Sequence, residues 1–167
     1  ELLQLKIGTL NPTVSTHVVQ NGYDPEVIDS IAQIQQGKDQ LQFAFVGTIY
    51  KWHPWKSVLH EYAQFLEKNP QANVKLNFYG INIPDELKAF VTSTYPQLDR
   101  RIEVFPRIPN AALLQQLAVN NVMLLFNYYS FMGTKIFDYL GIRRKIVLCY
   151  GNDPDAQLYG WNGTTNI

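Results

Sequence analysis

The chain has 167 residues, of which 46% are hydrophobic, and its 14 basic and 14 acidic side chains give a formal net charge of zero. This composition predicts one soluble globular domain with a sizeable core. Without net positive charge the chain lacks the general attraction to a nucleic-acid backbone, and the single basic run Arg143-Arg144-Lys145 is short, so we expect no DNA or RNA binding. No apolar run is long enough to cross a bilayer, and the lone Cys149 lies in an apolar strand, which favours a core residue in a cytoplasmic protein.

The first part of the chain shows a weak pattern over residues 1–15, which we expect, with residues 161–167, to be linker or truncated ends of a larger protein. A short strand is predicted over residues 16–20, followed by a turn at Asn21-Gly22. Asp24 before Pro25 is typical of a helix start, and this helix should continue to Gly37. Its inner face should consist of Val27, Ile28, Ile31 and Ile34.

The rest of the chain alternates between strands and helices. Strands are predicted over residues 41–46, 74–79, 101–105, 122–126 and 146–150. Helices are predicted to start near Pro54, at Pro84, after a cap at Asn110 and near Gly133. Their inward residues should be Val58, Tyr62, Phe65 and Leu66, then Leu87, Phe90 and Val91, then Leu113, Leu114, Leu117 and Ala118, and finally Ile136, Phe137 and Leu140. This order predicts an α/β fold: a Rossmann-like three-layer sandwich with a parallel sheet.

The segment 121–150 is the most informative part of the pattern. It predicts a strand, a loop at residues 127–133, a helix and a second strand, which is a right-handed crossover between parallel strands. In open parallel sheets ligands bind at the carboxyl ends of the strands, where this loop would lie. Arg143-Arg144-Lys145 should stay exposed at the other end of the helix.

The start of that helix has the chemistry of an anion site. Its first amides lack helical partners, Gly133 allows close approach, and Lys135 adds a full charge. Asp138 lies one turn later on the same face as Thr134, where its carboxylate could accept hydrogen bonds from a sugar diol. On spacing alone, a solvated acid in the first turn of an ordinary surface helix is the simpler interpretation.

Five short segments, taken in order, resemble the carboxy-terminal half of family 4 glycosyltransferases. The resemblance covers most of the chain from Thr16 to Tyr150. The segments are Val18-Val19-Gln20-Asn21-Gly22-Tyr23-Asp24, Phe43-Ala44-Phe45-Val46-Gly47-Thr48 with Lys56, Leu76-Asn77-Phe78-Tyr79-Gly80, Ile102-Glu103-Val104-Phe105-Pro106-Arg107-Ile108 and Gly133-Thr134-Lys135-Ile136-Phe137-Asp138-Tyr139-Leu140.

The resemblance implies half of a GT-B fold, in which two Rossmann-like domains face each other and the second binds a nucleotide-sugar donor. Residues 1–167 would then form a single nucleotide-sugar-binding domain of a two-domain, retaining hexosyltransferase. The partners implied are a UDP-, GDP- or ADP-sugar and an amino-terminal acceptor domain outside this chain. A role in cell-surface polysaccharide synthesis, with peripheral membrane contact through the other domain, would fit this family.

The resemblance also assigns donor-binding residues. Gly47, Thr48 and Lys56 resemble the loop that meets the diphosphate, although Lys51 could replace Lys56. Arg107 and Ile108 match the loop whose backbone meets the base. The remaining matches are Gly133, Thr134 and Lys135 at the diphosphate, Asp138 at the ribose, and Ser130, which stands where the family has a glutamate near the donor sugar.

The mechanism implied is electrostatic. Cleavage of the bond from sugar to diphosphate develops negative charge on the leaving group, which amides and lysines can stabilise. Lys56 and Lys135 are the electrostatic candidates, and no catalytic residue is otherwise assigned. No cofactor or metal is expected, because the three histidines and one cysteine show no ligand spacing and the chain has no Asp-x-Asp pair.

Other interpretations stay open. A sugar-nucleotide epimerase of the same fold would need acids that this segment lacks, and a signalling or nucleotide-binding module would share the fold without the chemistry. A receiver would show acids after its first strands, whereas Gly47 and Gly80 follow these strands here. His53 and His60 are interpreted as a loop residue and a helix-surface residue. Six aromatic residues are expected on loops at the mouth of the site. They could stack on a base or sugar, but contact with another domain or with the core is the simpler interpretation. They are Tyr50, Trp52, Trp55, Tyr128, Tyr129 and Phe131.

Overall fold

The computed structural model describes residues 2–17, 19, 21–126 and 133–150. Its centre is a five-stranded sheet in the order β3-β2-β1-β4-β5, and every neighbouring pair is parallel. The strands are β1 (Leu41–Val46), β2 (Val74–Tyr79), β3 (Ile102–Phe105), β4 (Val122–Phe126) and β5 (Lys145–Cys149). The predicted α/β sandwich with a parallel sheet is therefore confirmed.

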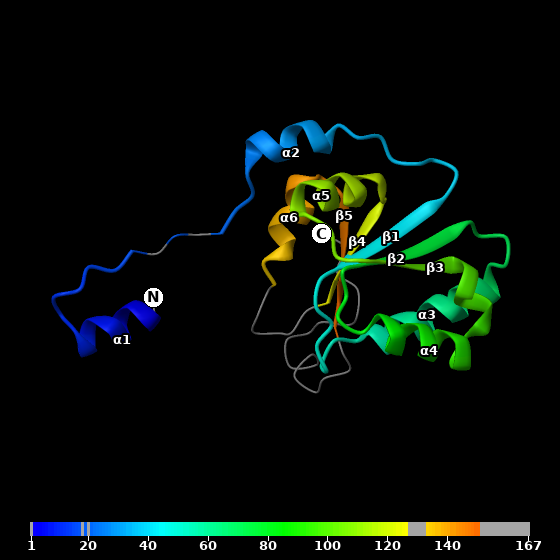
Figure 1. Cartoon of the computed structure of the whole chain (residues 1–167), viewed down its shortest axis with the longest axis horizontal. Coiled ribbons are helices and arrows are strands. Elements are labelled where there is room, and N and C mark those ends of the chain that lie inside the picture. The colour runs from blue at the N-terminus through cyan, green and yellow to red at the C-terminus, as the bar shows by residue number, and fades with distance from the viewer. Residues whose placement is uncertain (1, 18, 20, 127–132, 151–167) are drawn as a thin grey trace.

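Helices cover both faces of this sheet. Figure 1 shows α3 (Trp55–Lys68) and α4 (Pro84–Thr94) on one face, and α2 (Pro25–Ala32), α5 (Asn110–Val119) and α6 (Lys135–Gly141) on the other. The 3₁₀ helix η1 (Pro96–Arg101) leads into β3, and α1 (Leu2–Leu10) stands apart from the body in Figure 1. None of the described helices is long and apolar enough to span a bilayer.

The strands are apolar on both sides because each side meets a helical layer. In β1, Ala44 and Val46 belong to the cluster under α2, α5 and α6, whereas Phe45 belongs to the cluster under α3 and α4. Phe45 stacks on Phe126 of β4 with ring centroids 4.2 Å apart. Cys149 also packs against the second cluster, and burial raises the pKa of its thiol to about 12, as expected for a core residue.

The sheet opens between β1 and β4. β1 pairs with β2 over six residues but with β4 over only two, Phe43 with Val122 and Ala44 with Met123. The chain winds from β1 toward β2 and β3 and then crosses to β4 and β5, so the winding reverses at this gap. Crevices beyond the carboxyl ends of strands at such a reversal are the usual ligand sites of open α/β sheets.

The opposite, amino-terminal edge of the sheet is closed by amide side chains. The side-chain nitrogen of the buried Asn77 donates to Asn120 at 2.8 Å and to Gln42 at 3.1 Å. Asn120 donates in turn to the Tyr79 hydroxyl, and the backbone N–H of Gln42 donates to the side-chain oxygen of Asn121 at 2.7 Å. These bonds tie β1 and β2 to the segment that enters β4.

The amino-terminal part of the chain differs from the prediction. Residues 2–10 form a helix where only a weak pattern was seen, and Thr16, His17 and Val19 are not in a strand. The predicted strand over 16–20 is therefore wrong at these three positions, because a strand needs a hydrogen-bonded neighbour and they pair with none of the five strands; residues 18 and 20 lie outside the described ones. Asp24 caps α2 as predicted, through a 3.0 Å bond from the N–H of Glu26.

Some predicted boundaries and faces also shift. α2 ends at Ala32 rather than Gly37, because Ile34 turns back and gives its carbonyl to the Arg144 side chain. Asn110 is the first residue of α5 and makes no side-chain capping bond. Several residues assigned to inner faces are exposed, since the buried faces run through Ile28 and Ile31, through Trp55, Leu59 and Ala63, and through Ile136 and Tyr139. The exposed ones are Val27, Phe65 and Leu140.

Candidate functional site

A cavity of about 890 Å³ lies where the parallel strands β1 to β4 end. Glycines let the chain leave β1 and β2 sharply: Gly47 and Gly80 have φ angles of +113° and +59°, which side chains disfavour. A Cβ added to Gly80 would lie 3.4 Å from the Cα of Arg107. The absence of a side chain at Gly80 therefore lets the loops after β2 and β3 approach each other closely beside the cavity.

The structure brings seven of the predicted donor-binding residues to this cavity. They come from the loops after β1 and β3 and from the start of α6, which are far apart in the sequence. The helix itself begins at Lys135, with Thr134 as its cap. The seven cavity residues are Gly47, Thr48, Arg107, Ile108, Gly133, Thr134 and Lys135.

Lys56 lies elsewhere. It is exposed in the first turn of α3, and its Nζ lies 5.2 Å from the ring centroid of Trp55 and 5.3 Å from that of Phe90, on the α3 and α4 side. Trp55, predicted on a loop at the mouth, is instead a buried core residue. Because α3 begins with this tryptophan turned into the core, the next side chain points away from the cavity.

Asp138 does not line the cavity. Its Oδ2 accepts a 2.8 Å hydrogen bond from the Nζ of Lys135, which does line the cavity. The Asp138 side chain is 22% exposed. Ser130 lies outside the described residues, as do Tyr128, Tyr129 and Phe131.

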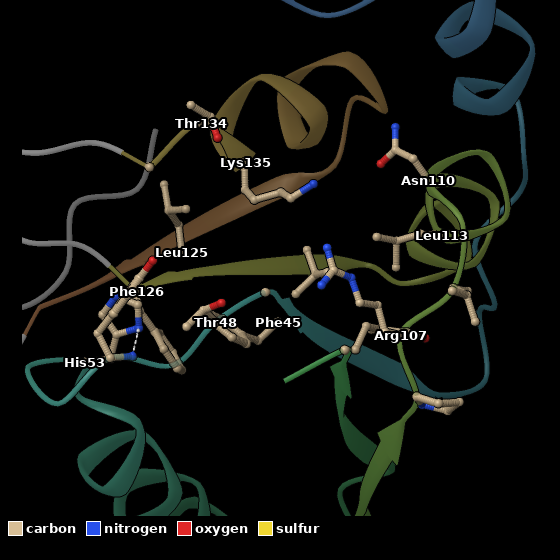
Figure 2. Close-up of a pocket in the computed structure, with 18 of the residues that line it drawn as sticks. Phe45, Thr48, His53, Arg107, Asn110, Leu113, Leu125, Phe126, Thr134 and Lys135 are labelled. Carbon is tan, nitrogen blue, oxygen red and sulfur yellow. Dashed lines mark hydrogen bonds between the residues drawn. The ribbon is translucent and has the colours of Figure 1, made fainter. Parts of the chain in front are cut away.

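Two cationic side chains point into the same space. In Figure 2, Lys135 extends over the cavity from α6 and the Arg107 guanidinium points into it from the loop after β3. No acidic residue is among the described residues that line the cavity. With two cations and no lining carboxylate, the cavity presents a positive field suited to an anionic ligand.

Aromatic side chains form the wall contributed by the loop after β1. Tyr50 and Trp52 lie at the mouth, 49% and 55% exposed, and their rings stack with centroids 4.9 Å apart. His53 lines the cavity behind them, with its ring edge-on to Phe45 and Phe126. Tyr50 and Trp52 thus occupy the predicted loop position.

His53 is a site residue that the sequence interpretation missed. The backbone N–H of Tyr50 donates to its Nδ1 at 3.2 Å, so the neutral ring carries its proton on Nε2. Burial lowers the pKa of His53, which favours this neutral form. The sequence contained one signal for this role. His53 lies in the loop that follows a parallel strand, directly before Pro54 and α3, and such loops lie at the carboxyl ends of the strands, where ligands bind. His60, in contrast, is exposed on α3 as predicted.

The described part of the chain contains no cluster of metal-ligating side chains. Across those residues, no group of three or more histidine, cysteine, aspartate or glutamate side chains could hold a metal ion. The expectation of a metal-independent site stays a prediction.

The fold and this cavity define a Rossmann-like α/β domain with a crevice, lined by Arg107 and Lys135, at the reversal of its sheet. No protein-family model matches the sequence, and no curated protein sequence matches it. Solved structures do match its fold. The apo form of the lipopolysaccharide outer core galactosyltransferase WaaB superposes on 90% of this chain and 42% of its own, with a TM-score of 0.59 and 13% identity.

Two further structures belong to trehalose phosphate enzymes. The E. coli trehalose-6-phosphate structure bound with UDP-2-fluoro glucose has a TM-score of 0.57 and 16% identity over 77% of this chain and 36% of its own. An α,α-trehalose-phosphate synthase (UDP-forming) from Burkholderia vietnamiensis has a TM-score of 0.56 and 13% identity over 77% of this chain and 37% of its own. At these identities the likeness is one of fold: this chain has the fold of one half of a GT-B glycosyltransferase and spans well under half of the length of these proteins.

Proposed function

We propose that this chain is the donor-binding domain of a retaining glycosyltransferase, which moves a hexose from a nucleotide-sugar to an acceptor. The observation that carries the proposal is the cavity of about 890 Å³ at the sheet reversal, with Arg107 and Lys135 pointing into it. A cavity of this volume fits a ligand the size of a nucleotide-sugar. The two cations suit its diphosphate.

The proposed chemistry uses charge rather than a covalent intermediate. As the bond from the sugar to the diphosphate breaks, negative charge grows on the leaving phosphate. Lys135 and Arg107 would stabilise that charge. Lys56 is outside the cavity, so Lys135 is the stronger of the two predicted electrostatic candidates.

The wider setting is also part of the proposal. UDP-, GDP- and ADP-sugars are the candidate donors, and a UDP-sugar analogue is bound in one of the structures with this fold. An acceptor-binding domain outside this chain would complete the active site, because the similar chains are more than twice as long as the part matched here. We further propose a metal-independent cytoplasmic enzyme of family 4 type that contributes to cell-surface polysaccharides.

Two alternatives share the fold. A sugar-nucleotide epimerase would need acid and base groups at the reacting sugar, and the described residues of the cavity include no carboxylate. A non-catalytic nucleotide-binding module would bind the same ligands without transferring a sugar. An assay for sugar transfer by a protein that joins this domain to an acceptor-binding domain would distinguish the enzyme from such a module.

The first test is a binding panel of UDP, GDP, ADP and their glucose conjugates, read by thermal shift and then by calorimetry. A ligand that binds only the folded chain raises its melting temperature, by an amount that grows with concentration above Kd. We expect one base to be preferred and its affinity to fall in Arg107→Ala. If no nucleoside diphosphate or conjugate shifts the melting temperature at millimolar concentration, the donor-binding assignment is wrong.

A further inference from the structure

The imidazole of His53 is held on one edge and open on the other. Its Nδ1 accepts a 3.2 Å hydrogen bond from the backbone N–H of Tyr50, so the neutral ring carries its proton on Nε2. That Nε2–H has no hydrogen-bond partner among the described residues. It is not sealed from solvent either, because the buried side-chain atom left without a partner there is the Oδ1 of Asn77. Since His53 lines the cavity, its free donor is available to a ligand.

Four aromatic rings pack around this imidazole. Phe45 and Phe126 lie on the side of the sheet, with centroids 6.3 and 5.6 Å from that of His53. Tyr50 and Trp52 lie at the mouth, at 5.2 and 6.2 Å, and their planes stand at 83° and 86° to the imidazole. These edge-on contacts restrict the rotation of the ring, so Nε2–H is a donor of fixed direction. A donor that is already ordered loses little conformational entropy when a ligand binds.

The acceptor that suits this donor is uncharged. A phosphate would favour a protonated imidazole, but a second proton on Nδ1 would break the hydrogen bond from Tyr50. Burial also lowers the pKa of His53 and so opposes protonation. Arg107 and Lys135, which line the same cavity, are stronger partners for phosphate. A hydroxyl group on a ring with an apolar face fits both the neutral donor and the aromatic wall.

The two cations lie between two different ends of the cavity. In Figure 2, Arg107 and Lys135 stand between His53 on one side and Asn110 on the other. Asn110 makes no side-chain capping bond, so its amide offers a donor and an acceptor together. The edge of a base presents donors and acceptors side by side, which a single N–H cannot match. With the diphosphate at the cations, the base therefore fits the Asn110 end and the sugar fits the His53 end.

We propose that His53 is a specificity-determining residue for the sugar: its Nε2–H donates to a hydroxyl oxygen of the hexose that is joined to the diphosphate. The inference rests on the proposed function and names a residue through which this domain recognises the group to be transferred. A nucleoside diphosphate without a sugar lacks the group that meets His53. Its affinity should therefore not depend on this side chain.

The test compares two probes on the 167-residue chain by calorimetry at neutral pH. The probes are whichever of UDP, GDP and ADP binds best and the tightest-binding of its hexose conjugates. His53→Asn places an oxygen near the position of Nδ1, so it can still accept from Tyr50, but it has no donor at the position of Nε2. The hexose conjugate should bind about fivefold more weakly to this variant, and the nucleoside diphosphate should stay within about twofold.

Two further variants complete the design. His53→Gln can donate from near the position of Nε2, so the hexose conjugate should bind within about threefold of the original affinity. His60→Asn is the matched control on α3. Both ring nitrogens of His60 already have protein partners, Tyr95 at 2.8 Å and Gln64 at 2.8 Å. Neither probe should respond to it by more than about twofold.

Heteronuclear NMR of the imidazole nitrogens tests the same contact without a substitution. When the hexose conjugate binds, His53 should keep its proton on Nε2 and an unprotonated Nδ1, and the Nε2 resonance should shift. The nucleoside diphosphate should leave that resonance close to its position in the free protein. Conversion of His53 to an imidazolium by both probes would show a contact with phosphate and would overturn the inference.

The outcomes separate this inference from the proposed function. If a nucleoside diphosphate binds and His53→Asn leaves the hexose conjugate unaffected, the role of His53 is wrong and the donor site stands. The same conclusion follows if the variant weakens both probes equally, because the contact then involves the nucleotide or the fold. If no nucleoside diphosphate and no conjugate binds to the original chain, the donor site and the inference are both overturned.

Discussion

The hydroxyl group of Tyr139 lies 3.3 Å from the backbone nitrogen of Val46, from which it accepts a hydrogen bond. It donates in turn to the carbonyl oxygen of Leu124 at 3.4 Å. A side chain of α6 thus links β1 and β4 just beyond the last paired residues of these two strands. The bridge holds the sheet open at the point where the cavity begins, without leaving the strand groups unpaired.

Tyr139→Phe should destabilise the fold by about 1–3 kcal/mol, because the Val46 amide is then buried without a partner. Tyr139 is fully buried, and burial raises the pKa of its hydroxyl, so the neutral group is present throughout the physiological range. Chemical denaturation with unchanged m-values measures this cost. Tyr95→Phe is the matched control, since its hydroxyl bonds to the exposed His60, and it should cost under about 0.5 kcal/mol. Equal costs for the two variants would contradict the bridging role.

Arg144 should be a structural residue although it belongs to a basic run predicted to be exposed. Its half-buried guanidinium donates to the carbonyls of Ala118, Ile34 and Ile142, at 2.6, 2.7 and 2.8 Å for the shortest bond to each. It therefore joins the carboxyl ends of α5, α2 and α6. Burial lowers the pKa of Arg144, yet the group keeps its charge because arginine titrates far above neutral pH.

Arg144→Met should lower the free energy of unfolding by about 2–4 kcal/mol, since several carbonyls lose a charged donor. The neighbouring Arg143→Met provides the comparison. Arg143 is exposed and makes a 3.4 Å contact with Asp29, so its loss should cost less than about 1 kcal/mol. The role assigned to Arg144 would be refuted if urea denaturation gave the two variants the same stability.

Arg107 should contribute to ligand affinity and little to stability. The side chain is exposed and points into the cavity. Arg107→Ala should weaken nucleoside diphosphate binding by about 1.5–3 kcal/mol, the range for a charge-assisted hydrogen bond, with an unfolding midpoint close to the original. Arg100→Ala, in η1 before β3 and so at the opposite edge of the sheet, is the control that should leave calorimetric affinity unchanged.

His53 should make stability depend on pH. Its pKa is lowered by burial from the ordinary value of 6.5, so the unfolded chain binds a proton more readily. The contribution of the neutral ring is therefore present above pH 6.5 and is lost as the pH falls toward the lowered folded value. His53→Gln should flatten the pH dependence of the unfolding free energy below pH 6.5. His60→Gln controls for the loss of a histidine, and an unaltered slope in His53→Gln would contradict the prediction.

Much of the architecture was predictable because local and tertiary preferences agree. The five strands are mostly apolar, since a parallel sheet covered on both faces needs little polar alternation, although Gln42, Lys75, Asn77 and Glu103 interrupt three of them. Asp24 and Pro25 carry a helix-start pattern that depends only on local hydrogen bonding. The glycines after β1 and β2 marked the strand exits, and both adopt positive φ angles in the structure.

The errors lie where contacts distant in sequence decide the outcome. The end of α2 depends on Arg144, which is more than a hundred residues away from Ile34. Lys56 was aligned with a ligand loop, but the burial of Trp55 turns it toward Phe90. His53 lines the cavity because α3 starts only at Trp55, which leaves His53 in the loop after β1. The ion pair between Lys135 and Asp138 was missed, because each side chain was assigned to a part of the ligand rather than to the other.

The two ends of the sheet have separate duties. Asn77, Asn120 and Gln42 lock the amino edge with neutral amides, and their hydrogen bonds involve no residue that lines the cavity except Tyr79. Protein engineers could therefore graft new loops between Gly47 and Pro54 or between Pro106 and Pro109 while the lock keeps the scaffold in register. Over evolutionary time the same division would let descendants of this domain change what they recognise and keep their shape.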